Sequence, residues 1–247
     1  MTGQTSSSLK DGHFTTTHWS VVLAARTAAS PDYKEALSSL CETYWFPIYA
    51  YLRGRGYTSH EAEDHTQGFL ATLMEKQGLH SVDPEKGRFR SYLLGALKHY
   101  LADARDQAQT QKQGGGYKIV SLDARNFENR LNLESDNELS PEQLFDRKWA
   151  LTILQRSIHR LEEESAGACE SNVTELIIRY LVPSSESVPY KVTAAELSMS
   201  EAAVKTAVYR LRRRYRELLI DEIAQTVAAE NEVEDEIRHL FAALSAC

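Results

Sequence analysis

The stretch TAAELSMSEAAVKTAVYRLRRRYRELL at residues 193–219 decides the fold expected for the C-terminal half of this 247-residue chain. Thr193 and Glu196 have the spacing of a capping box, which predicts a short helix that begins there. The Ser-Met-Ser that follows predicts a tight turn, and Ser200 is a typical N-cap for a longer helix over residues 201–228. A short helix, a three-residue turn and a long helix match helix-turn-helix geometry.

The long helix is expected to carry opposite chemistry on its two sides. Its apolar residues recur every three or four positions, so they share one face and are expected to be buried. These residues are Val204, Val208, Leu211, Tyr215 and Leu218. Between Lys205 and Arg216 there are six basic residues and no acidic one. The outward face is expected to contain Lys205, Thr206, Tyr209, Arg210, Arg212, Arg213 and Arg216.

This basic face predicts contact with DNA, because the first half of a recognition helix enters the major groove. The residues expected to reach base edges are Lys205, Thr206, Tyr209 and Arg210, since lysine and arginine bond guanine there. The residues expected to hold phosphates are Arg212, Arg213 and Arg216. The alternative is a solvated helix face whose basic residues pair with acids four positions away. The absence of acids within the basic run favours DNA contact.

The composition predicts an all-α protein. Apolar residues make up 42% of the chain and charged residues 26%, which excludes wholesale disorder. The 12 glycines and 6 prolines are too few for the many tight turns of an all-β chain. The net charge is -7, so a case for nucleic-acid binding must rest on local basic clusters.

The cysteines and the apolar runs predict a cytoplasmic protein. Cys41, Cys169 and Cys247 are far apart and form no CxxC pair, which favours a reducing compartment. The N-terminus has no apolar signal core. No apolar run approaches the roughly 20 residues that span a bilayer, so no membrane contact is expected.

Five segments are expected along the chain. They are a polar tail (1–16), a first helical domain (17–107), a flexible acidic linker (108–139), a helix-turn-helix domain (140–228) and an amphipathic helical extension (229–247). The linker is inferred from QAQTQKQGGG and from seven acidic against two basic residues over 121–146. The expected architecture is therefore two small helical domains joined by a linker.

Local signals predict where several helices begin and end. Capping boxes at Thr58 with Glu61 and at Ser140 with Gln143 predict helix starts. In the first domain, Pro47 is expected to bend or split a helix that ends at the glycines of Gly-Arg-Gly, residues 54–56. In the helix that follows the Ser140 N-cap and begins with a proline, one apolar stripe is expected to be buried. Its members are Leu144, Leu151, Leu154, Ile158 and Leu161.

A second basic segment lies in the first domain. Residues 86–112 hold six basic and two acidic residues, with Phe89, Tyr92 and Tyr100 interleaved. Basic grooves with aromatic platforms suit unstacked single strands of nucleic acid. The alternative is an ordinary core helix whose aromatic side chains all point inward, and the spacing alone favours this alternative.

The chain contains no recognised catalytic motif. HEAEDH at residues 60–65 places His60 and Asp64 four apart on one helix face, where a metal ion is conceivable. No second cluster with ligand spacing accompanies them, and GxSxG, P-loop, GxGxxG and HExxH motifs are absent from the sequence. We therefore expect no enzyme activity, no metal and no cofactor. The alternative to this expectation is a small helical metalloenzyme that uses His60 and Asp64.

Three segments, in their order and spacing, resemble a bacterial extracytoplasmic-function (ECF) sigma factor from about Trp19 to Leu219. ALSSLCETYWFPIYAYLRGRGYTSHEAEDHTQGFLATLME is similar to region 2 of that family. FRSYLLGALKHYLADARDQ resembles the part that opens and reads the −10 element, and YKVTAAELSMSEAAVKTAVYRLRRRYREL resembles region 4, which reads the −35 element.

The resemblance implies a promoter-specificity subunit that binds RNA polymerase core and promoter DNA, at the nucleoid in the cytoplasm. It also admits an anti-sigma factor or a regulatory kinase as a partner. The residues implied to meet the coiled coil of the largest polymerase subunit are Glu63, Asp64 and Gln67. The residues implied to act at the −10 element are Lys86, Arg88, Phe89, Arg90, Tyr92, Lys98 and His99.

Three positions depart from the family's pattern. His99 stands where the family usually has Asn, and Tyr92 stands where Trp is usual. Gly68 replaces a commoner polar or acidic residue, which implies weaker affinity for polymerase.

Two alternatives stay open at this point. A helix-turn-helix regulator that binds DNA without polymerase explains the C-terminal half but leaves Glu63 and Asp64 without a role. The last amphipathic stripe predicts a helix that either folds back over the basic helix and restrains it or packs as a stabilising cap. Its residues are Val233, Ile237, Leu240, Phe241 and Leu244.

Overall fold

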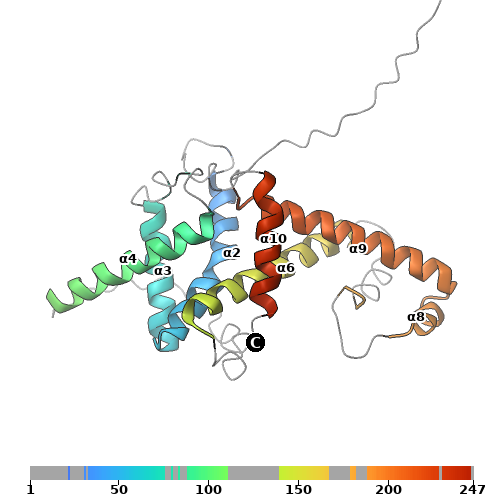
Figure 1. Ribbon diagram of the computed structural model, residues 1–247, viewed down its shortest axis with the longest axis horizontal. Coiled ribbons are helices and arrows are strands. Elements are labelled where there is room, and N and C mark those ends of the chain that lie inside the picture. The colour runs from blue at the N-terminus through green and yellow to red at the C-terminus, as the bar shows by residue number, and fades with distance from the viewer. Residues whose placement is uncertain are drawn as a thin grey trace, which may run out of the picture.

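The predicted all-α fold is confirmed. The computed structural model describes residues 22, 31, 33–75, 79, 83, 88–110, 139–166, 179–181, 188–227 and 230–245, and within them every regular element is a helix. The helices are α2 (Tyr33–Gly54), α3 (Ser59–Glu75), α4 (Phe89–Thr110), α6 (Pro141–Ala166), α8 (Tyr190–Glu196), α9 (Glu201–Ala224) and α10 (Glu230–Ser245) (Figure 1). The predicted tail and residues 111–138 of the predicted linker lie outside the described residues.

Two helix starts follow the predicted capping boxes. The Thr58 N–H donates to Glu61 Oε2 at 2.9 Å, and the Glu61 N–H donates back to Thr58 Oγ1 at 3.3 Å. The Ser140 N–H donates to Gln143 Oε1 at 2.9 Å, and the Gln143 N–H donates to Ser140 Oγ at 3.2 Å. Each box satisfies backbone donors that the first turn leaves without a partner, so α3 and α6 begin where predicted.

Helix α2 continues through Pro47, so the helix is not split there. The residues on both sides of Pro47 are buried, and this packing holds the helix across the missing backbone donor. The end of the helix agrees with the prediction. The Tyr57 N–H donates to the Leu52 carbonyl at 3.2 Å, and Gly56 has a φ of +86°, a left-handed conformation that glycine adopts without strain.

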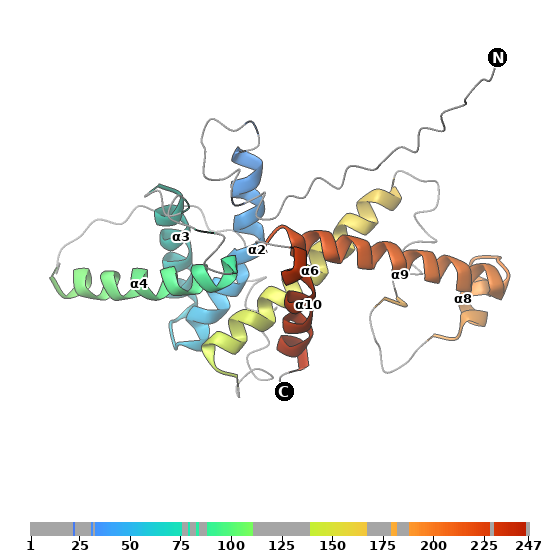
Figure 2. The same cartoon turned by 45° about the horizontal axis from the view of Figure 1, so that its top comes forward.

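Helix α6 lies at the centre of the molecule and packs against α2, α9 and α10 (Figure 2). One hydrophobic core contains residues of all four helices together with α3 and α4. Its members include Tyr44, Ile48, Leu93, Leu97, Trp149, Ile153, Ile223 and Leu240. The described helices on the two sides of residue 140 therefore share a core, and the division into two domains at that residue stays a prediction.

The buried surface of α6 is wider than the predicted stripe. Leu144 and Leu161 are buried as expected, but Leu151, Leu154 and Ile158 are half-buried. The most deeply buried side chains include Phe145, Trp149 and Ile153, which lie outside that stripe. A helix covered on more than one side needs more than one apolar face, and a search for a single stripe underestimates such a helix.

Helix α9 belongs to two clusters. Its end joins the main core through Leu219 and Ile223. Its beginning packs on α8 in a second, smaller cluster formed by Ala194, Val204 and Val208. Figure 1 shows α9 leaving the body of the molecule with α8 at its far end.

Helix α10 packs on α6 and on α9. Val233 and Leu240 are buried as predicted, whereas Phe241 is 55% exposed, so its place in the buried stripe was wrong. Residues 240 and 241 are about 100° apart around a helix, and only the first faces the core. The prediction that this helix folds over the basic run of α9 is not realised here, because that run is exposed. None of the described helices is long and apolar enough to span a membrane.

Candidate nucleic-acid interface

The beginning of α9 is fixed by its N-cap. The Ala203 N–H donates to Ser200 Oγ at 3.2 Å, which confirms Ser200 as the cap. The capping box predicted for the preceding helix is wrong, because α8 begins at Tyr190, three residues before Thr193. Thr193 is buried inside α8 instead, with its hydroxyl 2.6 Å from the Tyr180 hydroxyl.

The turn between α8 and α9 has the same hydrogen-bond pattern as the end of α2. The Met199 N–H donates to the Ala194 carbonyl at 2.9 Å, and the Ser198 N–H donates to the Ala195 carbonyl at 3.3 Å. This pattern requires a left-handed residue, which here is Ser198 with a φ of +53°. A residue with a Cβ atom is less stable in the left-handed conformation than glycine is. Ser198 therefore lowers the stability of the protein locally at this turn.

The two faces of α9 separate as predicted. Val204, Val208 and Leu218 are buried, and Leu211 and Tyr215 are half-buried; burial raises the pKa of Tyr215 to about 12. The seven residues predicted to face outward are all exposed: Lys205, Thr206, Tyr209, Arg210, Arg212, Arg213 and Arg216. Tyr209 is 69% exposed, a large fraction for an aromatic side chain. We call these seven residues the α9 face.

Acids just outside the basic run neutralise part of the α9 face. Lys205 Nζ lies 2.8 Å from Glu201 Oε1, and Arg213 Nε lies 3.1 Å from Glu217 Oε1. The hydrogen bond from Lys205 lowers the pKa of the Glu201 carboxyl. The pairing considered as an alternative to DNA contact is therefore present at both ends of the run. Exposed pairs of this kind contribute little to stability, so a polyanion displaces such acids at little cost.

Three arginines of the α9 face make no such pair with any residue that the structure describes. Arg212 donates to the Tyr180 carbonyl at 2.9 Å. Within the described residues, Arg210 and Arg216 have no hydrogen bond or ion pair. All three are exposed, so their guanidinium groups can reach an external partner without breaking an ion pair.

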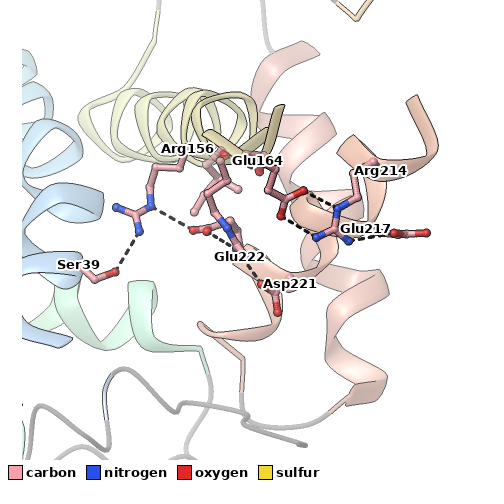
Figure 3. Close-up of polar contacts among 10 residues, drawn as sticks. Ser39, Arg156, Glu164, Arg214, Glu217, Asp221 and Glu222 are labelled. Carbon is pink, nitrogen blue, oxygen red and sulfur yellow. Dashed lines mark hydrogen bonds and ion pairs between the residues drawn. The ribbon is translucent and has the colours of Figure 1, made fainter. Parts of the chain in front are cut away.

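Arg214 is the one basic residue of the run that is not part of the α9 face, and it holds α9 against α6 (Figure 3). It donates to both carboxylate oxygens of Glu164 at 2.8 and 2.7 Å, and to Glu217 at 3.1 Å. These bonds raise the pKa of Arg214 and lower that of Glu164. About two turns further along α9, Asp221 and Glu222 bind Arg160 of α6 at 2.7 and 2.8 Å.

Arg156 connects this network to α2. Its guanidinium donates to Glu222 of α9 at 3.1 Å, and to Glu42 and Ser39 of α2 at the same distance. Figure 3 shows Arg156 between Ser39 and Glu222. Helix α9 is therefore attached to the main core by these polar contacts as well as by its apolar end.

In the second basic segment, unlike the α9 face, two arginines are held by a buried carboxylate. Arg88 Nε lies 2.9 Å from Glu236, and Arg90 Nε lies 2.6 Å from the other oxygen of the same carboxylate. Arg90 Nη1 also lies 2.7 Å from Asp146. Arg90 is 7% exposed, and its guanidinium is 5.4 Å from the centre of the Trp149 ring.

The aromatic residues of this segment point largely inward. Phe89 is fully buried and packs edge-on against Tyr44, with ring centres 5.3 Å apart. Tyr92 is half-buried and stacks on Phe89, with ring centres 6.2 Å apart. In this conformation Phe89 and Arg90, both predicted to act at the −10 element, are enclosed by the core and do not reach a DNA strand.

The remaining residues predicted for the −10 element differ in accessibility. Lys98 is exposed and lies 2.9 Å from Glu142 of α6; this hydrogen bond raises the pKa of Lys98 and lowers that of Glu142. His99 is exposed. Lys86 lies outside the described residues.

The residues predicted to bind polymerase lie together on α3. Asp64 is exposed, and Glu63 and Gln67 are half-exposed. Asp64 Oδ2 lies 2.9 Å from His60 Nδ1, so the pair considered for a metal does come together. No cluster of three or more His, Cys, Asp or Glu occurs among the described residues.

Gly68 has a structural explanation. A Cβ atom at this position would lie 2.4 Å from the Tyr100 hydroxyl oxygen, which packs over α3 from α4. Glycine at this position permits the close approach of Tyr100. The interpretation of Gly68 as a change in polymerase affinity is therefore not needed to explain the residue.

Sequence reasoning missed the acids that pair with the second basic segment: Glu142, Asp146 and Glu236. For Glu236 a signal was available. It lies three positions after Val233 and four before Leu240, on the apolar side of an amphipathic pattern. A carboxylate at such a position predicts a buried cationic partner.

Comparison with known proteins does not identify the chain. No family model, no curated protein and no solved structure matches it. The interpretation of the site therefore rests on the residues and contacts described above.

Proposed function

We propose that this protein is a sigma-type promoter-specificity subunit of bacterial RNA polymerase. The observation that carries the proposal is the exposed α9 face, which holds five of the six basic residues between Lys205 and Arg216 and no acid, in a chain whose net charge is -7. Such a concentration of positive charge on one helix is the electrostatic footprint of a DNA-binding surface.

In this proposal the beginning of α9 enters the major groove. Lys205, Thr206, Tyr209 and Arg210 lie in its first three turns and reach base edges. Three arginines follow on the same exposed surface and hold phosphates: Arg212, Arg213 and Arg216. The anchoring of Arg214 to Glu164 supports this role, because it keeps the helix in a defined orientation for readout.

The proposal includes a polymerase contact through α3. Glu63, Asp64 and Gln67 form a polar, partly exposed surface on α3. Figure 1 shows α3 and α9 on opposite sides of α6. The net negative charge opposes tight binding of the free chain to a polyanion. Attachment to polymerase raises the effective concentration of the DNA-binding helix at a promoter, so modest contacts become specific.

The test is reconstitution with bacterial RNA polymerase core. We expect the chain to co-elute with the core in gel filtration and to direct run-off transcription from templates selected out of a random library. Arg210→Ala should reduce transcription and relax sequence choice at the upstream element, costing about 1–3 kcal/mol of discrimination. Arg238→Ala is the matched control, since this exposed arginine lies on α10 outside the α9 face. A chain that does not associate with the core contradicts the proposal.

A second candidate is a helix-turn-helix regulator that acts without polymerase. One observation favours it: Arg88, Arg90 and Lys98 are paired with acids of the same chain, whereas Arg210 and Arg216 of the α9 face have no such pair within the described residues. Tight sequence-specific duplex binding by the isolated protein, unchanged when Glu63 and Asp64 are replaced by Gln and Asn, would support this candidate instead.

A further inference from the structure

Three basic residues of the second segment are each bound to an acid from the C-terminal part of the chain. Arg88 and Arg90 bind Glu236 of α10, and Lys98 binds Glu142 of α6. Arg90 also binds Asp146 of α6, 56 positions away in the sequence. A carboxylate offers a guanidinium the same charge and hydrogen-bond geometry as a phosphate does. These acids therefore occupy the positions that nucleic-acid phosphates would take on the same side chains.

Glu236 is the residue on which this arrangement depends most. Its side chain is 1% exposed, and it lies between Val233 and Leu240 on the buried side of α10. A carboxylate in such a place is strongly disfavoured unless cations pair with it. Arg88 and Arg90 both pair with Glu236, so the packing of α10 on the core depends on these two arginines. They cannot bind a phosphate group in the same geometry while they hold Glu236.

We propose that α10 is an intramolecular inhibitor of single-strand binding, in which Glu236 competes with the DNA strand for Arg88 and Arg90. This inference rests on the proposed function and adds to it that the second basic segment captures the unpaired strand. Displacement of α10 removes Glu236 from both arginines, while Arg90 keeps its ion pair with Asp146 of α6, and a bound strand in turn keeps α10 displaced. Figures 1 and 2 both show α10 beside the first turn of α4.

The proposal gives the two DNA contacts an order. The α9 face is already exposed, so duplex binding through it requires no rearrangement. Capture of the unpaired strand requires α10 to leave Arg88 and Arg90 first. While α10 is packed on Arg88 and Arg90, the protein can bind duplex DNA through the α9 face but cannot bind an unpaired strand through these arginines.

The experiment compares Glu236→Gln with Glu234→Gln in the full-length protein. Both changes remove one negative charge from α10, but Glu234 is exposed and Glu236 is buried. The probes are a fluorescein-labelled single-stranded oligonucleotide of mixed sequence and a mixed-sequence duplex, measured by anisotropy. Hydrogen exchange of residues 88–93 reports whether α10 has released the start of α4.

Glu236→Gln should increase exchange at residues 88–93 and tighten single-strand binding by about fivefold to 150-fold, the usual range of coupling between two sites. It should leave duplex binding at the level of Glu234→Gln. If Glu236→Gln does not fold, Glu236→Asp keeps the charge but shortens its reach, and the same two changes are expected with smaller size. Increased exchange without tighter strand binding would overturn the inference, because Glu236 would then be a structural ion-pair partner only. Unchanged exchange in a folded variant would overturn it as well.

The proposed function is tested separately in the same assay. Arg210→Ala should weaken duplex binding and leave single-strand binding of the Glu236→Gln protein unchanged. Loss of the Arg210 effect contradicts the role of the α9 face, whereas loss of the Glu236 effect contradicts only the inhibition by α10.

Discussion

Two segments of this protein contain the same number of basic residues but differ in how far the folded chain encloses them. Residues 86–112 and residues 205–216 each contain six basic residues. In the first, Arg88, Arg90 and Lys98 are paired with acids of α6 and α10. In the second, the predicted DNA-contacting residues are exposed, and the acids that pair with them are exposed as well. The acids that reach a basic run therefore decide whether its side chains are available to a partner, and the run alone does not.

The largest expected difference between the two segments is in stability. Arg90→Ala leaves the buried Glu236 with Arg88 alone and Asp146 without its arginine, so it should lower the free energy of unfolding by about 3–5 kcal/mol. Arg216→Ala, at an exposed position of the α9 face, should change it by less than about 0.5 kcal/mol. Urea unfolding followed by circular dichroism measures both values. Equal effects of the two substitutions would contradict the contrast drawn here.

A smaller, stabilising effect is expected at the turn that begins the α9 face. Ser198 has a left-handed conformation, which a glycine adopts without the penalty of a side chain. Ser198→Gly should raise the free energy of unfolding by about 1 kcal/mol, and Gly56→Ser, the reverse change at the matching turn after α2, should lower it by a similar amount. Thermal unfolding by calorimetry distinguishes the two. A loss of stability in Ser198→Gly would show that the serine side chain has a role beyond the turn.

The smallest effect is expected for the exposed pair between Lys98 and Glu142. The hydrogen bond lowers the pKa of Glu142, so its contribution is present above the ordinary carboxyl pKa and is lost as the pH falls below it. It raises the pKa of Lys98, so the contribution is also lost as the pH rises through that raised value. Both side chains are exposed, and the pair is worth less than about 1 kcal/mol.

A double-mutant cycle with Glu142→Gln and Lys98→Met measures this coupling. It should be present at neutral pH and absent at pH values well below the ordinary carboxyl pKa. A coupling that persists in acid would mean that the two side chains interact through packing and not through charge.

Sequence reasoning was most successful where the determining contacts are local. The caps at Thr58, Ser140 and Ser200 and the turn at Gly56 depend on residues a few positions apart, and all four are confirmed. The inward and outward faces of α9 follow from helical periodicity and are also confirmed.

The predictions that failed depend on contacts between distant residues. Thr193 has a good capping-box partner in the sequence, but Tyr180 engages its hydroxyl and α8 begins earlier. Trp149 is in the centre of the core because helices from both ends of the chain cover α6. Arg90 is buried because of Glu236, 146 positions away, and a one-dimensional charge pattern contains no such information.

The measurement that tests the account most directly is hydrogen exchange of the full chain before and after addition of a mixed-sequence DNA duplex. The account predicts slower exchange at residues 201–216 of α9 and no change at residues 88–93 of α4. Protection of residues 88–93 with α9 unchanged would contradict it, because the enclosed segment and not the exposed face would then be the surface that meets duplex DNA.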